Sequence, residues 1–457
     1  MKRSVLACLL TLATSAAGAP SAGAAQMSLK DCVVQAIVNS PALSSGRFLV
    51  EADKADIKKK RGTTLPYLSS SLQGYEVNGA PVTVWYPLGL FQPENPSSTG
   101  THNPEAHWAP VGMESVGITY PLLSGGSILG LNDPPPVAIS RADMDQQTIT
   151  NLITEAKVVF NVVTDYIYIT AYHLQATTQE QMVEVATKQL EIAKAQVVVG
   201  LKLPQQVQVA QAQLDSASRG LEAARENERS FTTDLAKVIG TSDAELKLDQ
   251  TPTPLTPLPP LHLFLDRVMA NHPALQVQEG KVEVARQQLR VDNANFWPSA
   301  NLNTSFASAQ DLDYFNGSSA HPRPTAFLSY IEVVIPLYDF GQRRAAIDES
   351  KQNLLSQSET VKALDLGIRT EIAGAYNQIE QYAESASQFQ SAFVKADQAA
   401  DLARAQYQVG ATDQLTVVSA ELAALQQKVQ VELTEMSERL KYAELQNLAA
   451  DNWRWAP

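Results

Sequence analysis

The sequence predicts a mainly helical protein that also contains a few antiparallel strands and uses one layout twice. Long tracts without proline indicate long helices, and short alternating apolar segments that end at a proline indicate strands. Several motifs also recur in the same order in the two halves of the chain. We therefore expect two structural repeats, 26–240 and 261–450, joined by a proline-rich linker over 241–260.

Residues 1–25 have the composition of a cleavable signal peptide. Lys2 and Arg3 precede an apolar run, and small residues at Ala22-Gly23-Ala24 end the segment. The run is too short to cross a bilayer, and Cys8 comes too early to carry a lipid anchor. Loss of Lys2 and Arg3 leaves 33 of the 35 basic residues against 48 acidic ones, a formal charge of −15. Nucleic acid is therefore not an expected partner, and Cys32 has no second cysteine with which to form a disulfide.

The first repeat begins with an amphipathic helix that we expect to run from Leu29 to Gly62. Next come a strand, a long loop rich in Pro, Gly, Asn and aromatic residues, and a returning strand that Pro121 ends; these elements are expected over 67–75, 76–112 and 113–120.

A tract from Ile139 to Val199 contains neither proline nor glycine, and a second helical tract follows Gly200. The pattern predicts a long antiparallel helical hairpin over 139–238, with a small helical domain as the alternative.

The second repeat follows the same order of elements. After an opening helix we expect a strand over 299–309, a loop over 310–325, a strand over 326–335, a helical hairpin over 342–450 and a short tail over 451–457. The second strand alternates, with Phe327, Ile331, Val333 and Ile335 on one side and Pro336 after its end. The tract from Gln342 to Val409 contains no proline, so it forms one very long helix or a closely stacked pair.

Matching motifs relate the two repeats. A shift of 232 residues superimposes Asn39, Pro41, Ala42 and Leu43 on Asn271, Pro273, Ala274 and Leu275. A shift of 215 relates Pro121 and Gly126 to Pro336 and Gly341, and a shift of 210 relates Val199-Gly200 to Val409-Gly410. Because order and spacing persist across whole halves, we interpret the chain as an internal duplication.

The four expected strands suggest how the chain meets a membrane. Strands of about nine residues have the length to cross an outer membrane, but a closed barrel needs about eight of them. One chain cannot close a barrel, whereas three chains would supply twelve strands. An oligomer is therefore needed to close a barrel, in which Phe327, Ile331, Val333 and Ile335 would face lipid. The alternative, a soluble sandwich, needs a second apolar layer that the sequence does not show.

Several of these motifs resemble the TolC family of outer-membrane efflux proteins, over nearly the whole mature chain. They are Asn39-Ser40-Pro41-Ala42-Leu43, Asn271-His272-Pro273-Ala274-Leu275, Pro336-Leu337-Tyr338-Asp339-Phe340-Gly341-Gln342-Arg343 and Tyr407-Gln408-Val409-Gly410. The resemblance implies a homotrimer with a 12-stranded outer-membrane β-barrel, four strands from each chain. The barrel would continue into a long periplasmic α-helical coiled-coil tunnel, with the linker 241–260 and the end of the chain in a mixed equatorial region. It also implies a passive exit duct that carries substrates from an inner-membrane transporter and a periplasmic adaptor, or membrane fusion protein, across the outer membrane.

The resemblance further implies that the two hairpin tips dock the periplasmic adaptor. These tips are Val199-Gly200-Leu201 and Val409-Gly410-Ala411. A glycine permits a tight turn and the close approach of another backbone. A turn without any partner is the plain alternative.

A gate at the tunnel entrance is the second site that the resemblance implies. Tyr407 matches the family's tyrosine three residues before the tip glycine, but Thr416 and Ser419 occupy the positions of two later aspartates. Asp413 and Glu421 lie nearby and are the remaining candidates for an acidic pore constriction. A charged residue on a hydrated helix is more commonly part of a solvated face.

Enzymatic chemistry finds no support in the sequence. There is no phosphate-binding P-loop and no Gly-x-Ser-x-Gly nucleophile elbow, and the six histidines are scattered. We expect no enzyme activity, cofactor or metal, so the energy for transport comes from the inner-membrane partner. The rival interpretation is a soluble periplasmic coiled-coil adaptor or scaffold, which would not need an apolar strand face. A periplasmic metal-binding protein is disfavoured by the few His and Met ligands.

Overall fold

The computed structural model describes residues 27–78, 108–201, 203–241, 248–249, 255, 257–311 and 325–450. The expected signal peptide and tail, most of the linker and the centres of both loops lie outside these ranges. The chain divides into two compact units. We call Met1–Ser44, Ile153–His272 and Gly367–Pro457 the helical unit, and Ser45–Leu152 and Pro273–Leu366 the sheet unit.

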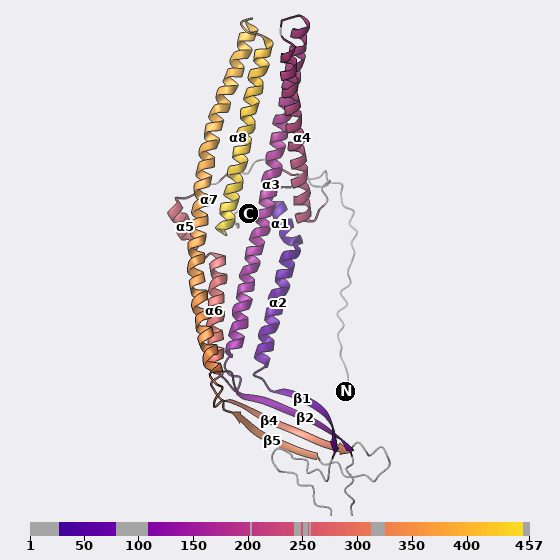
Figure 1. Ribbon diagram of the computed structural model, residues 1–457, viewed down its shortest axis with the longest axis vertical. Helices are drawn as coiled ribbons and strands as arrows, with labels where there is room; N and C mark the ends of the chain where they lie inside the picture. The colour runs from indigo at the N-terminus through magenta and orange to yellow at the C-terminus, as the bar shows by residue number, and fades with distance from the viewer. Residues whose placement is uncertain are drawn as a thin grey trace, which may run out of the picture. The chain divides into compact units, whose positions relative to one another are not determined.

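The sheet unit contains an antiparallel sheet in the order β1-β2-β4-β5 (Figure 1). Its strands are β1 Tyr67–Asn78, β2 Trp108–Ser124, β4 Ser299–Asp311 and β5 Thr325–Val334, and the short β3 Ser127–Ile128 pairs with the end of β2. The central pairing of β2 with β4 joins the two repeats. Among the described residues, no strand pairs with the outer side of β1 or β5.

The first two strands are longer than the sequence predicted. β1 continues to Asn78 and β2 begins at Trp108, so the expected loop 76–112 is wrong at both ends. Pro121 was expected to end the returning strand at 120, but β2 continues to Ser124. The ladder changes its register between Pro121 and Leu123, and such an irregularity tolerates the missing N–H of proline. β5 ends at Val334, so Ile335 lies just beyond the strand that was expected to contain it.

The expectation of one helix from Leu29 to Gly62 is wrong. The chain forms α1 Leu29–Asn39 and α2 Pro41–Gly62, with Ser40 extended between them at φ −67° and ψ 117°. A proline ring clashes with a helical conformation of the preceding residue, and proline itself fits the first position of a new helix. The second repeat has the same break, between α5 Leu261–Met269 and α6 Pro273–Ala294.

Four further helices form two long hairpins. They are α3 Pro135–Val198, α4 Gln205–Ile239, α7 Gln342–Gln408 and α8 Gln414–Leu448. α7 is one helix of 67 residues and not a stacked pair, and it is about 100 Å long at 1.5 Å per residue. α3 begins before the expected Ile139 because Pro135 and Pro136 occupy its first turn, where their missing N–H groups are not needed.

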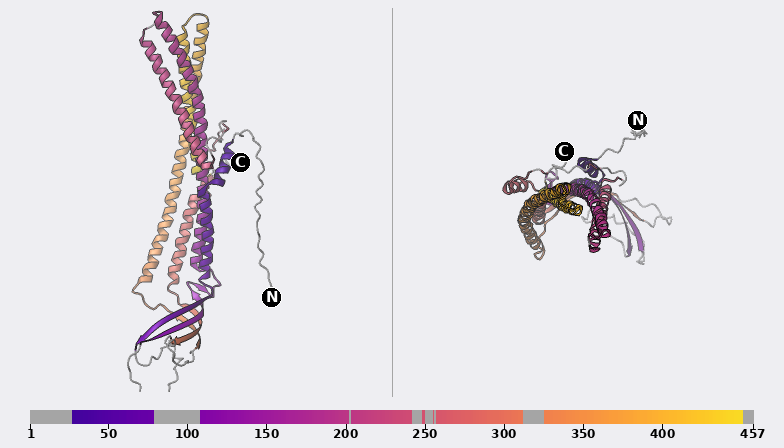
Figure 2. Two further views of the ribbon diagram at one scale, coloured as in Figure 1. Left: turned by 90° about the vertical axis from the view of Figure 1, so that its right-hand side faces the viewer. Right: turned by 90° about the horizontal axis from the view of Figure 1, so that it is seen from above.

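Within the helical unit, the α3–α4 and α7–α8 pairs lie side by side (Figure 2) and share buried contacts. A buried cluster joins α1, α3, α4 and α8, and includes Cys32, Val162, Tyr166, Leu235 and Ala443. Burial raises the pKa of the Cys32 thiol to about 11, so this thiol is unreactive at neutral pH.

Small residues allow the long helices of this unit to approach closely. Ala210, Ala217 and Ala224 are buried at a spacing of seven residues on α4, as in coiled coils. Ala193 on α3 and Ala403 on α7 are buried too. In contrast, Ala195 and Ala405 are exposed.

No described helix contains a stretch that is both long and apolar enough to cross a membrane.

Aspartate–arginine contacts hold both junctions between the sheet and the long helices. In the first repeat, Asp133 accepts a hydrogen bond from Arg61 Nε at 3.2 Å and another from Arg141, which joins the end of α2 to the start of α3. In the second repeat, Asp339 Oδ2 accepts from the Arg343 backbone N–H at 2.9 Å and from Nε at 2.6 Å. Arg343 also donates to the Asn295 carbonyl at 3.3 Å, just beyond α6.

We expect Asp339→Ala to lower the melting temperature of the protein, because the substitution leaves the first turn of α7 without its acceptor. The bonds from Arg343 hold the pKa of Asp339 below its ordinary 3.8. A lowered folded-state pKa adds stability above the unfolded value and loses it as pH falls. The difference from wild type should therefore be full at pH 7 and shrink below about pH 4.

The matched control is Asp348→Ala on the same helix. Asp348 is exposed and lies 3.7 Å from Lys351, and a surface ion pair of this kind contributes little to stability. An equal loss in both variants would contradict the role of Asp339.

Candidate functional site

One face of the sheet is apolar across all four strands. Cross-strand partners share a face, and the row Val116–Phe306–Phe327 crosses β2, β4 and β5. The same face carries exposed apolar residues on every strand, namely Leu68, Leu72, Val116, Ile118, Phe306, Phe327, Ile331 and Val333. Among the described residues, the polar exceptions on this face include Glu114, Thr304 and Ser329. The hydroxyl oxygens of Thr304 and Ser329 lie 3.0 Å apart. The alternation predicted for β5 thus continues over the whole sheet.

The opposite face is mainly polar. Its residues include Ser69, Ser71, Ser115, Thr119, Asn301, Asn303, Ser305 and Glu332, interspersed with Tyr67, Leu328, Tyr330 and Val334. Hydrogen bonds link neighbouring strands on this face. Ser71 and Ser115 hydroxyls lie 2.8 Å apart, Thr119 donates to Asn303 at 3.0 Å, and Asn303 donates to Glu332 at 3.4 Å. A sheet with one apolar and one polar face can separate lipid from water.

The two hairpin tips have the same backbone structure. Gly200 and Gly410 adopt left-handed φ values of 76° and 74°. The N–H of Leu201 donates to Gln196 O at 2.9 Å, and the N–H of Ala411 donates to Gln406 O at 2.8 Å, which is the Schellman pattern at a helix end. Val199, Leu201 and Val409 are exposed at the tips. The predicted tip residues therefore form two equivalent turns with apolar side chains in solvent.

The predicted gate residues have different surroundings. Tyr407 is exposed on the last turn of α7. Asp413 caps α8, since its side chain accepts from the Thr416 backbone N–H at 2.9 Å. Glu421 accepts from Arg404 Nε at 2.7 Å. Both carboxylates thus have local structural contacts, which sequence spacing alone did not indicate.

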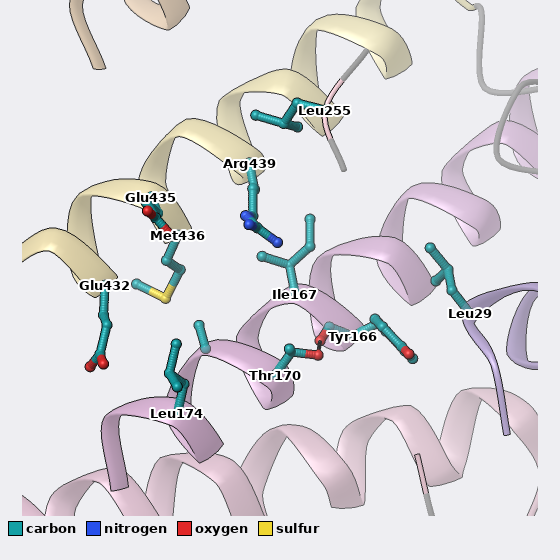
Figure 3. Close-up of a pocket in the computed structure, with 11 residues that line it drawn as sticks. Leu29, Tyr166, Ile167, Thr170, Leu174, Leu255, Glu432, Glu435, Met436 and Arg439 are labelled. Atoms are coloured by element: carbon teal, nitrogen blue, oxygen red, sulfur yellow. Dashed lines mark hydrogen bonds between the residues drawn. The ribbon is translucent and has the colours of Figure 1, made fainter. Parts of the chain in front are cut away.

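Sequence reasoning missed a buried carboxyl group in the helical unit. Figure 3 shows a pocket between α3 and α8, with Ile167 and Leu174 opposite Met436. Glu432 lines this pocket and is 7% exposed; Oε1 accepts from the Thr178 hydroxyl at 2.7 Å, and Oε2 has no hydrogen-bond partner among the described residues. Burial raises the pKa of Glu432 and outweighs the opposing effects of Thr178 and Lys428. The spacing of acidic residues along α8 resembles that of an exposed face, so no sequence signal marked Glu432.

Among the described residues, no group of three or more His, Cys, Asp or Glu side chains is arranged to hold a metal ion.

The chain belongs to the outer membrane efflux protein family, whose profile matches residues 32–241 and 264–450. The match covers both repeats and confirms the resemblance that the motifs indicated. This family consists of channels and not of enzymes, in agreement with the expectation of no bond chemistry.

Particular relatives agree with this assignment. The outer membrane efflux protein BepC of Brucella suis is 25% identical over 256 residues, 56% of this chain and 55% of BepC, so the chain spans about half the length of that curated relative. The structure of the outer membrane protein VceC from Vibrio cholerae has a TM-score of 0.72 at 16% identity and covers 92% of this chain and 96% of that one. The Campylobacter jejuni CmeC outer membrane channel has a TM-score of 0.73 at 14% identity, with 93% and 86% covered. These structures confirm a TolC-like fold with two repeats.

Asp165 gives the helical unit a pH dependence. Burial, and then the charge of Asp234, raise the pKa of this carboxyl from 3.8 to about 6. A raised folded-state pKa of an acid means that stability falls as pH rises from about 4 to about 6. We expect Asp165→Asn to match wild type near pH 4 and to be more stable at pH 8 by about 1–2 kcal/mol, from the free energy of a pKa shift discounted for partial exposure. Thermal unfolding of the purified protein between pH 4 and pH 8 measures this difference.

The exposed Glu222, on α4, supplies the control for this measurement. Glu222→Gln should leave the pH profile unchanged. A wild-type profile in the Asp165→Asn variant would show that this carboxyl does not titrate as described.

Proposed function

We propose that the chain is a trimeric exit duct in the outer membrane, part of a tripartite efflux or secretion system. The observation that carries this proposal is the two-faced sheet, whose edge strands β1 and β5 have no further partner among the described strands. Its apolar face suits lipid and its polar face suits a water-filled lumen, while backbone groups on a free edge within a membrane need partner strands. Three copies of four strands give twelve, within the range of outer-membrane barrels.

The long hairpins supply the rest of the duct. α3, α4, α7 and α8 contribute four helices from each chain, and their small buried residues suit side-by-side packing in a periplasmic tunnel. Substrates pass without bond chemistry, and an inner-membrane transporter supplies the energy. The amino-terminal signal peptide directs the chain to the envelope.

The tips and their neighbours supply contacts for partners and for gating. The exposed Val199, Leu201 and Val409 suit an apolar contact with a periplasmic adaptor, whose side chains can approach closely at Gly200 and Gly410. Tyr407 is the leading gate residue because its side chain is exposed. Asp413 and Glu421 are the further candidates for the pore. Each would have to act there while accepting its hydrogen bond, Asp413 from Thr416 and Glu421 from Arg404.

The proposal is tested by the mass and conductance of the chain extracted from outer membranes. We expect a particle of three chains that forms ion-conducting pores in planar bilayers. Ile331→Arg should abolish this particle, because an arginine on the lipid face costs about 2–4 kcal/mol at the bilayer midplane.

Asn301→Arg is the matched control, because Asn301 lies on the polar face opposite Glu332. This variant should assemble and change only the ion selectivity of the pore. A wild-type chain recovered as a soluble periplasmic monomer would overturn the proposal and favour the adaptor interpretation.

Adaptor docking is tested separately with the double variant Gly200→Val, Gly410→Val. Both glycines have positive φ, so valine strains the turns and places a branched side chain at each tip. We expect loss of drug resistance in cells that depend on this chain, with trimers still present.

Gly367→Val on α7 is the control, since a Cβ atom at Gly367 meets no atom within 4 Å and its φ is not positive. Full resistance in the double variant would refute docking at the tips.

A further inference from the structure

We infer that the segment from Leu337 to Phe340 on one copy of the chain packs against Leu65 and Tyr67 of the next copy. The inference rests on the proposed trimer and names the residues that join its subunits where the sheet meets the helices. We call 337–340 the junction segment.

The junction segment is strongly exposed within the chain. Leu337 is 90% exposed, Tyr338 76% and Phe340 91%. The rings of Tyr338 and Phe340 touch edge to face with centroids 4.8 Å apart, so they form one apolar patch. Contiguous apolar patches of this kind are typical of interaction surfaces.

The position of the patch selects its partner. The junction segment follows β5, one of the two edge strands of the sheet, after Ile335 and Pro336 (Figure 1). The other edge strand, β1, begins at Tyr67, next to Leu65, and both side chains are exposed. Each edge of the sheet therefore ends in exposed apolar residues on the side of the helices.

Chain direction brings these two sets of residues together. β1 begins just after α2, and β5 ends just before α7. The start of β1 and the end of β5 therefore lie at the same end of the sheet, where the strands connect to helices. When the β5 edge of one copy pairs with the β1 edge of the next, the strands are antiparallel, like every other pair in the sheet. The end of β5 then lies beside the start of β1, which places the junction segment near Leu65 and Tyr67. This contact joins one surface of a copy to a different surface of the next copy. Repeating such a contact gives a closed ring when the rotations between successive copies add up to a full turn.

The chemistry of the junction segment favours protein over lipid as its partner. Asp339 lies between Leu337 and Phe340, and its carboxylate binds Arg343. The side chains of Asp339 and Arg343 are only 25% and 18% exposed. Charged groups within the hydrocarbon region are costly, whereas aromatic residues and arginine are common at protein interfaces.

The experiment is disulfide cross-linking of the mature chain in outer membranes. We expect Leu65→Cys with Phe340→Cys to give covalent trimers under mild oxidation, and reduction should return them to single chains. The two single-cysteine variants should remain uncross-linked. The native Cys32 does not interfere because it is fully buried.

Leu72→Cys with Phe340→Cys is the matched control. Leu72 is an exposed β1 residue five positions beyond Tyr67, about 16 Å further along the strand. The inference would be overturned if the trimers have normal mass but Phe340→Cys cross-links to Leu72→Cys and neither to Leu65→Cys nor to a cysteine placed by Tyr67→Cys. The proposed function would still stand in that case. A monomeric native mass would overturn both.

Fluorescence in liposomes that contain brominated lipid tests the competing partner. Ile331→Trp should be quenched and Phe340→Trp should not. Equal quenching at both positions would show that lipid covers Phe340 and would overturn the inference.

Discussion

The open edges of the sheet are the physical constraint on which the rest of the proposed assembly depends. β1 and β5 each present a row of backbone N–H and carbonyl groups that no described strand of the chain satisfies. Loops or charged side chains protect such edges in many soluble proteins. Here the edges accompany an apolar face, so burial in lipid would leave their polar groups without partners unless neighbouring chains supply them. In the proposed assembly, the sheet can therefore enter the membrane only if the copies also associate.

The junctions between sheet and helices meet a second constraint. A strand must turn sharply into a long helix without losing the hydrogen bonds of either element. Prolines mark both junctions in the sequence, and aspartate–arginine contacts hold them in space, through Asp133 in the first repeat and Asp339 in the second. Strand, turn and helix are thereby fixed by a few polar side chains next to exposed apolar ones.

The sequence predicted the fold class, the repeats and the positions of the tips because these features depend on local patterns. Period-two alternation in β5 and the proline-free tracts needed no tertiary information. The break at Ser40 was not predicted, although a proline strongly restricts the residue before it. The extension of β2 through Pro121 depends on a register change that only the partner strand β4 makes visible.

Site residues were harder to predict than elements. Asp413 lies near the tip in the sequence, but its bond to Thr416 is evident only once the start of α8 is known. Glu432 and Asp165 resemble surface carboxylates in sequence, but neighbouring helices bury Glu432 and half-bury Asp165. The spacing of charged residues predicts which face of a helix can be exposed to solvent. It does not predict whether another helix packs against that face.

The internal duplication has a consequence for ancestry. Each repeat carries two long strands of the sheet and one hairpin, with the same proline break and the same tip turn. A half-length ancestor that formed the proposed ring would have needed six identical copies to supply the same strands. Fusion of two such copies would replace one repeating contact with two alternating kinds, and it would leave the Leu201 and Ala411 tips free to diverge from each other.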